Sequence, residues 1–194
     1  MDDLHADFSR MLPRLRANNL QRELLVRAAR IRGVDGPLRA VDATAGLGED
    51  ALLLAAAGFL VTMYERNAVV AAMLREGLER AREDDRLAEI IGRMDLVEGD
   101  SIQALSTMKT SPDVVYLDPM FPARRKSAAT KKKLQFIRQL EKPCPDEEEL
   151  LRAALAARPR KVVVKRPLKG PHLAGVKPSS SFAGKVVRYD CIVP

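Results

Sequence analysis

The sequence predicts an α/β protein with a mostly parallel, twisted sheet and helices on both faces. Apolar strand-like runs and helical patterns alternate from residue 38 onward, which is typical of such sheets. A glycine-containing turn at residues 46–48 joins the first strand to the first helix. Four of the strands end at or beside a carboxylate. The 194 residues, 46% of them hydrophobic, suffice for one hydrophobic core.

Residues 1–36 are expected to form an N-terminal helical extension. Leucines recur there at roughly helical spacing, and Gly33, Gly36 and Pro37 end the pattern. Residues 37–194 are expected to form the α/β domain.

The remaining elements follow from short apolar runs and their stop signals. The expected strands are 38–44, 60–64, 94–98, 113–117, 161–165 and 185–193, and the expected helices are 49–57, 68–82, 102–108 and 145–157, the last capped by Asp146. Residues 169–184 are expected to be a loop because they contain glycines, prolines and three serines. Ligands of open α/β sheets bind outside the carboxyl ends of the strands. The carboxylates of Asp42, Glu65, Asp100 and Asp118 are therefore expected to line one crevice.

The turn after the first strand has the spacing of a nucleotide-cofactor loop. Gly46, Gly48 and Ala51 fit the G-x-G-x-x-G/A dinucleotide fingerprint. Glu65 follows Gly46 by 19 residues, which suits a carboxylate that binds ribose hydroxyls. This pattern alone fits either a nicotinamide cofactor or S-adenosylmethionine.

Acidic residues around the turn favour S-adenosylmethionine. Asp42, Glu49 and Asp50 would face a pyrophosphate unfavourably, whereas they suit a sulfonium and an ammonium group. Asp100 and Ser101 follow the third strand, where they can contact the adenine amino group or the methionine end.

The fourth strand ends in Asp118-Pro119-Met120-Phe121, which has the form of the [Asn/Asp]-Pro-Pro-[aromatic] motif of amino-nitrogen methyltransferases. Asp118 is expected to accept the N–H groups of the substrate amine and aim its lone pair. Pro119 stiffens the turn that fixes this geometry. Phe121 is expected to stack on an extruded base.

The net charge of +7 is unevenly distributed. Residues 123–142 hold eight Lys or Arg against one acid, and residues 158–188 hold nine with none. Such stretches favour a polyanionic partner, most simply nucleic acid. The predicted phosphate contacts are Arg124, Arg125, Lys126, Lys131, Lys132, Lys133, Lys165 and Arg166.

Two cysteines and two histidines without ligand spacing predict neither a disulfide framework nor a metal site. The longest apolar run, residues 51–63, is too short to span a bilayer, and the acidic N-terminus lacks the features of a signal peptide. We therefore expect a cytoplasmic protein with no membrane partner.

Five segments together resemble the bacterial RsmJ family, whose members are S-adenosylmethionine-dependent methyltransferases of small-subunit ribosomal RNA that act on guanine N2. The segments are residues 41–48, 64–71, 114–122, 126–127 and 162–167. The resemblance implies a Rossmann-like class I methyltransferase with a shortened N-terminal region and 16S-type rRNA or the 30S subunit as partner. It also implies cofactor contacts at Glu49, Asp50, Glu65, Arg66, Asp100, Ser101 and Asp118.

Several alternatives remain open. The amino target could be adenine N6 in RNA or DNA or a protein glutamine, and the chain could be a non-catalytic RNA-binding relative. A nicotinamide oxidoreductase is disfavoured by the acids at the glycine turn. A monomer or a weak dimer is expected.

Overall fold

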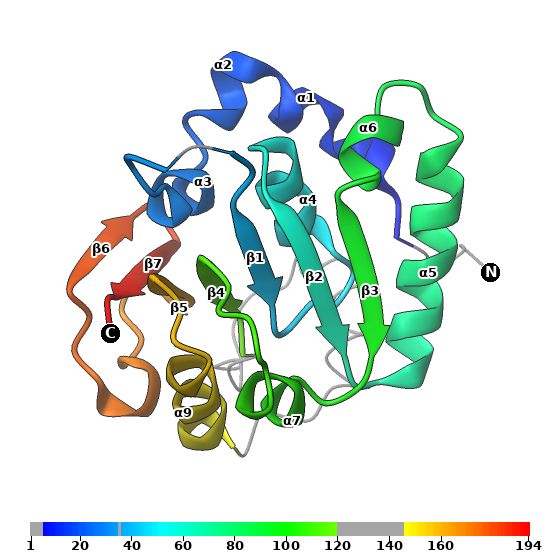
Figure 1. The fold of residues 1–194 in the computed structure, drawn as a ribbon. Helices are drawn as coiled ribbons and strands as arrows, with labels where there is room; N and C mark the ends of the chain where they lie inside the picture. The colour runs from blue at the N-terminus through cyan, green and yellow to red at the C-terminus, as the bar shows by residue number, and fades with distance from the viewer. Residues whose placement is uncertain (1–5, 35, 120–145) are drawn as a thin grey trace, which may run out of the picture.

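The computed structural model describes residues 6–34, 36–119 and 146–194. Their centre is a seven-stranded sheet with the order β3-β2-β1-β4-β5-β7-β6 (Figure 1). The strands are β1 (Arg39–Asp42), β2 (Leu60–Glu65), β3 (Met94–Glu98), β4 (Val114–Leu117), β5 (Lys161–Pro167), β6 (Ser180–Ala183) and β7 (Val187–Ile192). The first five strands run parallel, whereas β7 is antiparallel to both β5 and β6.

Helices cover both faces of the sheet. They are α1 (Leu12–Leu15), α2 (Ala17–Leu20), α3 (Leu24–Ala29), α4 (Glu49–Ala56), α5 (Ala68–Arg82), α6 (Ala88–Ile91), α7 (Ser101–Ser106) and α9 (Glu147–Ala156), with 3-10 turns η1 (Phe8–Met11) and η2 (Leu173–Gly175). One hydrophobic cluster joins α3, α4, α5 and α6 to the sheet, and a second joins α7 and α9 to it.

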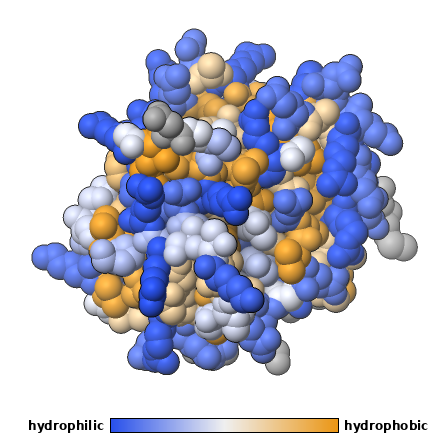
Figure 2. Space-filling model, viewed as in Figure 1, coloured by the Kyte–Doolittle hydropathy of each residue, from blue (hydrophilic) through white to orange (hydrophobic). Residues whose placement is uncertain are grey.

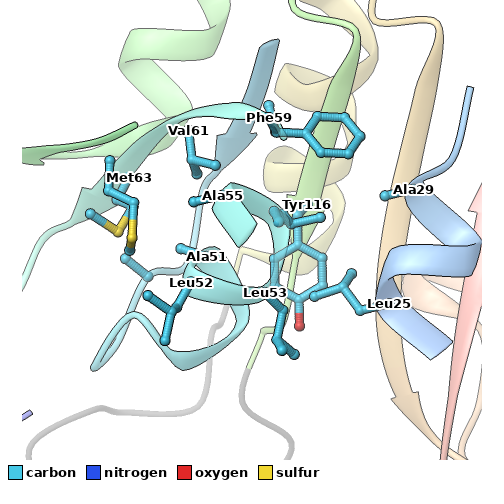
Figure 3. Packing of buried hydrophobic residues seen from close by; sticks show 14 of the residues in the cluster. Leu25, Ala29, Ala51, Leu52, Leu53, Ala55, Phe59, Val61, Met63 and Tyr116 are labelled. Carbon is cyan, nitrogen blue, oxygen red and sulfur yellow. The ribbon is translucent and has the colours of Figure 1, made fainter. Parts of the chain in front are cut away.

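Helix α4 lies at the centre of the larger cluster. Its residues 51–55 are all fully buried, as expected for a helix between a sheet and other helices. Figure 3 shows α4 side chains packed near Val61 and Met63 of β2, with the Tyr116 ring of β4 between Leu53 and Leu25. This packing fixes the start of α4, and with it the glycine turn, against the carboxyl ends of the strands.

The N-terminal segment is less regular than the expected helix. Arg16 and Glu23 have ψ angles of 136° and 127°, so extended backbone divides the segment into short helical pieces. Residues on both sides of position 36 belong to the same hydrophobic cluster. The division of the chain there into an extension and a domain stays a prediction.

Other differences from the expected elements are local. Strand β6 forms within the stretch expected to be a loop, because it pairs with β7 despite its polar sequence. Helix α6 was not expected. Asp146 does not cap α9 through its side chain; three glutamates in the first turn, residues 147–149, complement the helix dipole instead.

Hydrophilic side chains cover much of the visible surface, with apolar groups between them (Figure 2). Within the part of the chain that the structure describes, no helix combines the length and the apolar character that crossing a membrane requires.

Candidate functional site

Carboxylates lie along the carboxyl edge of the parallel strands. Asp42 ends β1, Glu65 ends β2, Asp100 follows β3 by two residues, and Asp118 follows β4 directly. Because these strands are neighbours in the order β3-β2-β1-β4, the four residues lie in sequence along one edge. This is the edge at which open α/β sheets bind their ligands.

Glu65 holds the glycine turn in place. Its Oε2 accepts the Gly46 N–H at 2.9 Å, and its Oε1 accepts the Asn67 N–H at 2.8 Å. Burial raises the pKa of Glu65, and these backbone hydrogen bonds oppose the rise. Gly46 has a φ of 53°, and a Cβ added there would meet no atom within 4 Å. The turn therefore has an open side next to a fixed carboxylate, as a bound ribose requires.

Gly48 serves a different purpose. It has a φ of 76° at the N-cap of α4, and an added Cβ would lie 2.8 Å from Leu74 Cδ1 and 3.4 Å from Phe8 Cζ. The second glycine of the fingerprint is therefore required by the packing of the N-terminal segment and α5 over the turn.

The side chain of Asp42, the last residue of β1, is bonded to the turn that follows. Its side chain is buried, and Oδ1 accepts the Thr44 N–H at 3.0 Å. Burial raises the pKa of Asp42 to about 8, and the hydrogen bond from Thr44 only partly offsets that effect. Asp42 therefore shapes the turn through this hydrogen bond. Its direct contact with the cofactor stays a prediction.

Lys165 joins the cofactor turn to the end of β4. Its Nζ lies 2.6 Å from Asp50 Oδ2 and 2.9 Å from Asp118 Oδ2, and Tyr116 donates its hydroxyl to Asp50 at 2.6 Å. Burial alone would lower the pKa of Lys165, but the two carboxylates outweigh burial and raise it. Burial raises the pKa of Asp118, whereas Lys165 favours its ionised form.

The backbone of Asp118 is fixed as well. Its N–H donates to Thr44 Oγ1 at 2.7 Å, which ties the end of β4 to the turn after β1. Pro119 is buried. A carboxylate at this position is therefore held at both its main chain and its side chain.

Two predicted phosphate contacts need correction. The Lys165 ammonium is bound to two carboxylates, so it belongs to the internal network. The Arg166 side chain has no exposed surface; it pairs with Glu147 at 3.3 Å and donates to the Pro171 carbonyl at 2.9 Å. Adjacent strand residues point to opposite faces, which is why these neighbours have different partners. Lys165 is therefore neutralised by its partners and Arg166 is shielded from solvent, so neither is suited to a phosphate contact.

The other predicted cofactor residues surround the turn. Glu49 and Arg66 are exposed beside it. Asp100 caps α7, where its Oδ1 accepts the Ile102 N–H at 2.8 Å, and Ser101 is buried. Asp100 is exposed to solvent beyond the end of β3.

Some predicted site residues lie outside the described residues. They are Phe121, Arg124, Arg125, Lys126, Lys131, Lys132 and Lys133. Conversely, Thr44 and Tyr116 join the network although nothing in their sequence context indicated a role.

The residues at this edge fit S-adenosylmethionine better than a dinucleotide. The turn carries carboxylates, and the described lysine at its side, Lys165, is neutralised by two of them. Such an environment suits the positive sulfonium and ammonium groups. Glu65 next to open Gly46 suits the ribose, and Asp100 at the end of β3 can accept a hydrogen bond from the adenine amino group.

Comparisons with known proteins agree with this geometry. A family model described as "Putative SAM-dependent methyltransferase" matches residues 1–194. Two proteins named ribosomal RNA small subunit methyltransferase J are similar to the chain: that of Thioalkalivibrio sulfidiphilus is 47% identical over 90% of this chain and 69% of its own length, and that of Rhodopseudomonas palustris is 44% identical over 93% and 81%. Several further relatives of that name are matched over only 59% to 63% of their length.

A crystal structure of a SAM-dependent methyltransferase from Neisseria gonorrhoeae is also similar. It superimposes with a TM-score of 0.76 at 33% identity, over 98% of this chain and 74% of that one. The predicted class I, Rossmann-like fold and the predicted cofactor, S-adenosylmethionine, are therefore confirmed. The chain belongs to the ribosomal RNA small subunit methyltransferase J family of S-adenosylmethionine-dependent methyltransferases.

Proposed function

We propose that the protein transfers a methyl group from S-adenosylmethionine to the exocyclic N2 of a guanine in small-subunit ribosomal RNA. The name of its relatives supports the RNA substrate. The observation that carries the chemistry is the position of Asp118, which follows β4 beside the cofactor turn and is linked to Asp50 through Lys165.

An exocyclic amine is a poor nucleophile because its lone pair is conjugated with the base. Asp118 accepts a hydrogen bond from an N–H of this amine. The lone pair of the nitrogen then turns out of the ring plane and toward the methyl donor. The cofactor, when bound, supplies an electrophilic methyl group on a sulfonium. Asp118 or solvent would take the proton that the amine releases once it is methylated.

Lys165 positions Asp118 for this step. The ammonium holds one carboxylate oxygen at 2.9 Å and favours the ionised form, which is the stronger hydrogen-bond acceptor. Because the same ammonium also binds Asp50 in the first turn of α4, it fixes the acceptor relative to the cofactor turn. Lys165 is a positioning residue in this account.

The RNA contacts remain part of the proposal. The basic residues at positions 124–133 directly follow the Asp118 motif in the sequence, so they can bind phosphates beside the extruded base. We also propose that the protein acts in the cytoplasm, where ribosomal subunits are assembled, as a monomer or a weak dimer.

The test is methyl transfer to 30S subunits isolated from cells that lack this enzyme. With labelled S-adenosylmethionine, we expect label in the RNA, and nucleoside mass spectrometry should identify N2-methylguanosine. Asp118→Ala, which removes the acceptor, should reduce transfer by at least about 100-fold while the variant still binds S-adenosylhomocysteine. Label in N6-methyladenosine or in protein, or an equal rate for the variant, would refute the proposal.

A further inference from the structure

A concavity lined by Tyr189 lies beside the network of Asp50, Lys165 and Asp118, because Tyr189 pairs with Lys165 between β7 and β5. It has a volume of about 440 Å³, within the usual range for ligand sites. Arg14, Asn19, Arg22 and Glu23 of the N-terminal segment form one wall. Val187 and Tyr189 of β7 form the other wall. We refer to it as the N-terminal cleft.

The charges of the N-terminal cleft favour an anion. Arg14 binds Glu23 in a bidentate pair, with Nε–Oε1 and Nη2–Oε2 distances of 2.7 and 2.8 Å. This pair is neutral as a unit. Arg22 is exposed, and it forms no ion pair with the residues that the structure describes. One unbalanced guanidinium therefore faces a cleft whose other charges compensate each other.

Besides the Arg22 guanidinium, the cleft contains the hydroxyl group of Tyr189. Its ring packs near Tyr116, with centroids 6.5 Å apart, and only 5% of the residue is exposed. Within the described parts of the chain, its hydroxyl forms no hydrogen bond, although the residue lines the cleft. A nearly buried hydroxyl of this kind gains a partner when a polar ligand enters.

The topology places the cleft on the substrate side of Asp118. Tyr189 pairs with Lys165 across β5 and β7, and Lys165 contacts Asp118. The cofactor turn and Glu65 lie on the other side of β4, after β1 and β2. A cofactor that spans Glu65 and reaches Asp118 therefore approaches from the side opposite to the cleft.

We propose that the N-terminal cleft binds a nucleotide of the RNA next to the methylated base, with its phosphate at Arg22 and its base or ribose at the Tyr189 hydroxyl. This inference rests on the proposed function, because it assigns a subsite to the same substrate. The Arg14–Glu23 pair stiffens the wall of the subsite. The flipped base would then be held at Asp118 while its neighbour is anchored in the cleft.

The test compares Arg22→Ala with Arg82→Ala. Both arginines are exposed, but Arg82 ends α5, whose N-terminus follows β2, so it lies toward the opposite edge of the sheet. Binding is measured by fluorescence anisotropy with a short single-stranded RNA oligonucleotide, and KM is measured with undermethylated 30S subunits. We expect Arg22→Ala to weaken binding and raise KM about five- to tenfold, with a salt slope smaller by about 0.7, and Arg82→Ala to change neither. Tyr189→Phe should weaken binding about threefold.

Two outcomes separate this inference from the proposed function. Methylation by the wild type with indistinguishable Arg22→Ala and Arg82→Ala variants would overturn the cleft and leave the function standing. RNA binding that depends on Arg22 without any methyl transfer by the wild type would overturn the function and support the cleft. If Arg22→Ala weakened the binding of S-adenosylhomocysteine instead, the cleft would belong to the cofactor, and the inference would be wrong.

Discussion

Asp118 depends on Lys165 for its ionised state. Burial raises the pKa of Asp118, and the neighbouring ammonium opposes that rise. Removal of the ammonium should therefore raise the pKa of Asp118, so that less of the stronger, ionised acceptor is present at neutral pH. Loss of the Lys165 ammonium should therefore change the pH dependence of methyl transfer as well as the stability of the fold.

Lys165→Met should shift the acid limb of the pH dependence of kcat to higher pH and lower kcat about tenfold or more at pH 7. The control is Lys161→Met on the same strand, because the Lys161 ammonium donates to the carbonyls of Ala28 and Arg30 and has no part in the site. Kinetics from pH 5 to 9 measure both. An acid limb that stays in place in Lys165→Met would contradict the positioning role.

Asp42 opposes folding at neutral pH. Its pKa is about 8 in the folded chain, against its usual value near 4 in an unfolded one, so the unfolded state releases a proton that the folded state keeps. Its contribution to stability is therefore greatest below pH 4 and is lost as the pH rises toward 8. Asp42→Asn should raise the free energy of unfolding relative to the wild type, by up to about 1.4 kcal/mol per pH unit in this window. Urea unfolding at pH 5 and pH 7.5 measures the difference; an equal effect at both values would count against it.

The two glycines of the turn have different roles: Gly48 is required for packing, and Gly46 leaves the cofactor side open. Gly48→Ala places a Cβ 2.8 Å from Leu74 in a left-handed backbone, and should lower the free energy of unfolding by about 2 kcal/mol. Gly46→Ala has an open environment and should cost less, about 1 kcal/mol, but should weaken S-adenosylhomocysteine binding more. Urea unfolding and calorimetry separate the two effects. The account of the turn would be wrong if the two variants exchanged these phenotypes.

The elements predicted from sequence are those with a local signal. The parallel strands are short apolar runs next to a turn, and α5 was expected with its observed bounds. The structure adds that the Asn67 side chain caps this helix. Strand β6 was missed because only its pairing with β7 defines it. The N-terminal helix was overextended because its leucines pack against α4 and the sheet from several short pieces.

Some site residues could be predicted from sequence and others could not. Sequence spacing predicted that Glu65 and Asp118 would lie near the turn, since each ends or follows a parallel strand. It could not predict that Lys165 would face Asp50 and Asp118, which lie 115 and 47 positions away, because that contact depends on side-chain direction across strands. For the same reason it assigned the buried Arg166 to the surface.

At the scale of the whole molecule, a chain of net charge +7 with two basic stretches should bind RNA mainly through phosphates. Raising the salt concentration from 50 to 200 mM should lower RNA affinity at least about tenfold. Replacing Lys131, Lys132 and Lys133 together by Gln should reduce the salt slope by about 2, whereas Arg82→Gln should leave it unchanged. Anisotropy titrations measure both slopes. An affinity that does not depend on salt would contradict phosphate binding.

The central claim is that this chain methylates a guanine amine of small-subunit rRNA through Asp118. Mass mapping of 16S-type rRNA from a deletion strain, complemented with either the wild type or Asp118→Ala, tests it most directly. We expect one N2-methylguanosine to be absent in the deletion strain, restored by the wild type and not restored by Asp118→Ala. An rRNA whose modifications are unchanged by the deletion, or a site restored equally by the variant, would contradict the account.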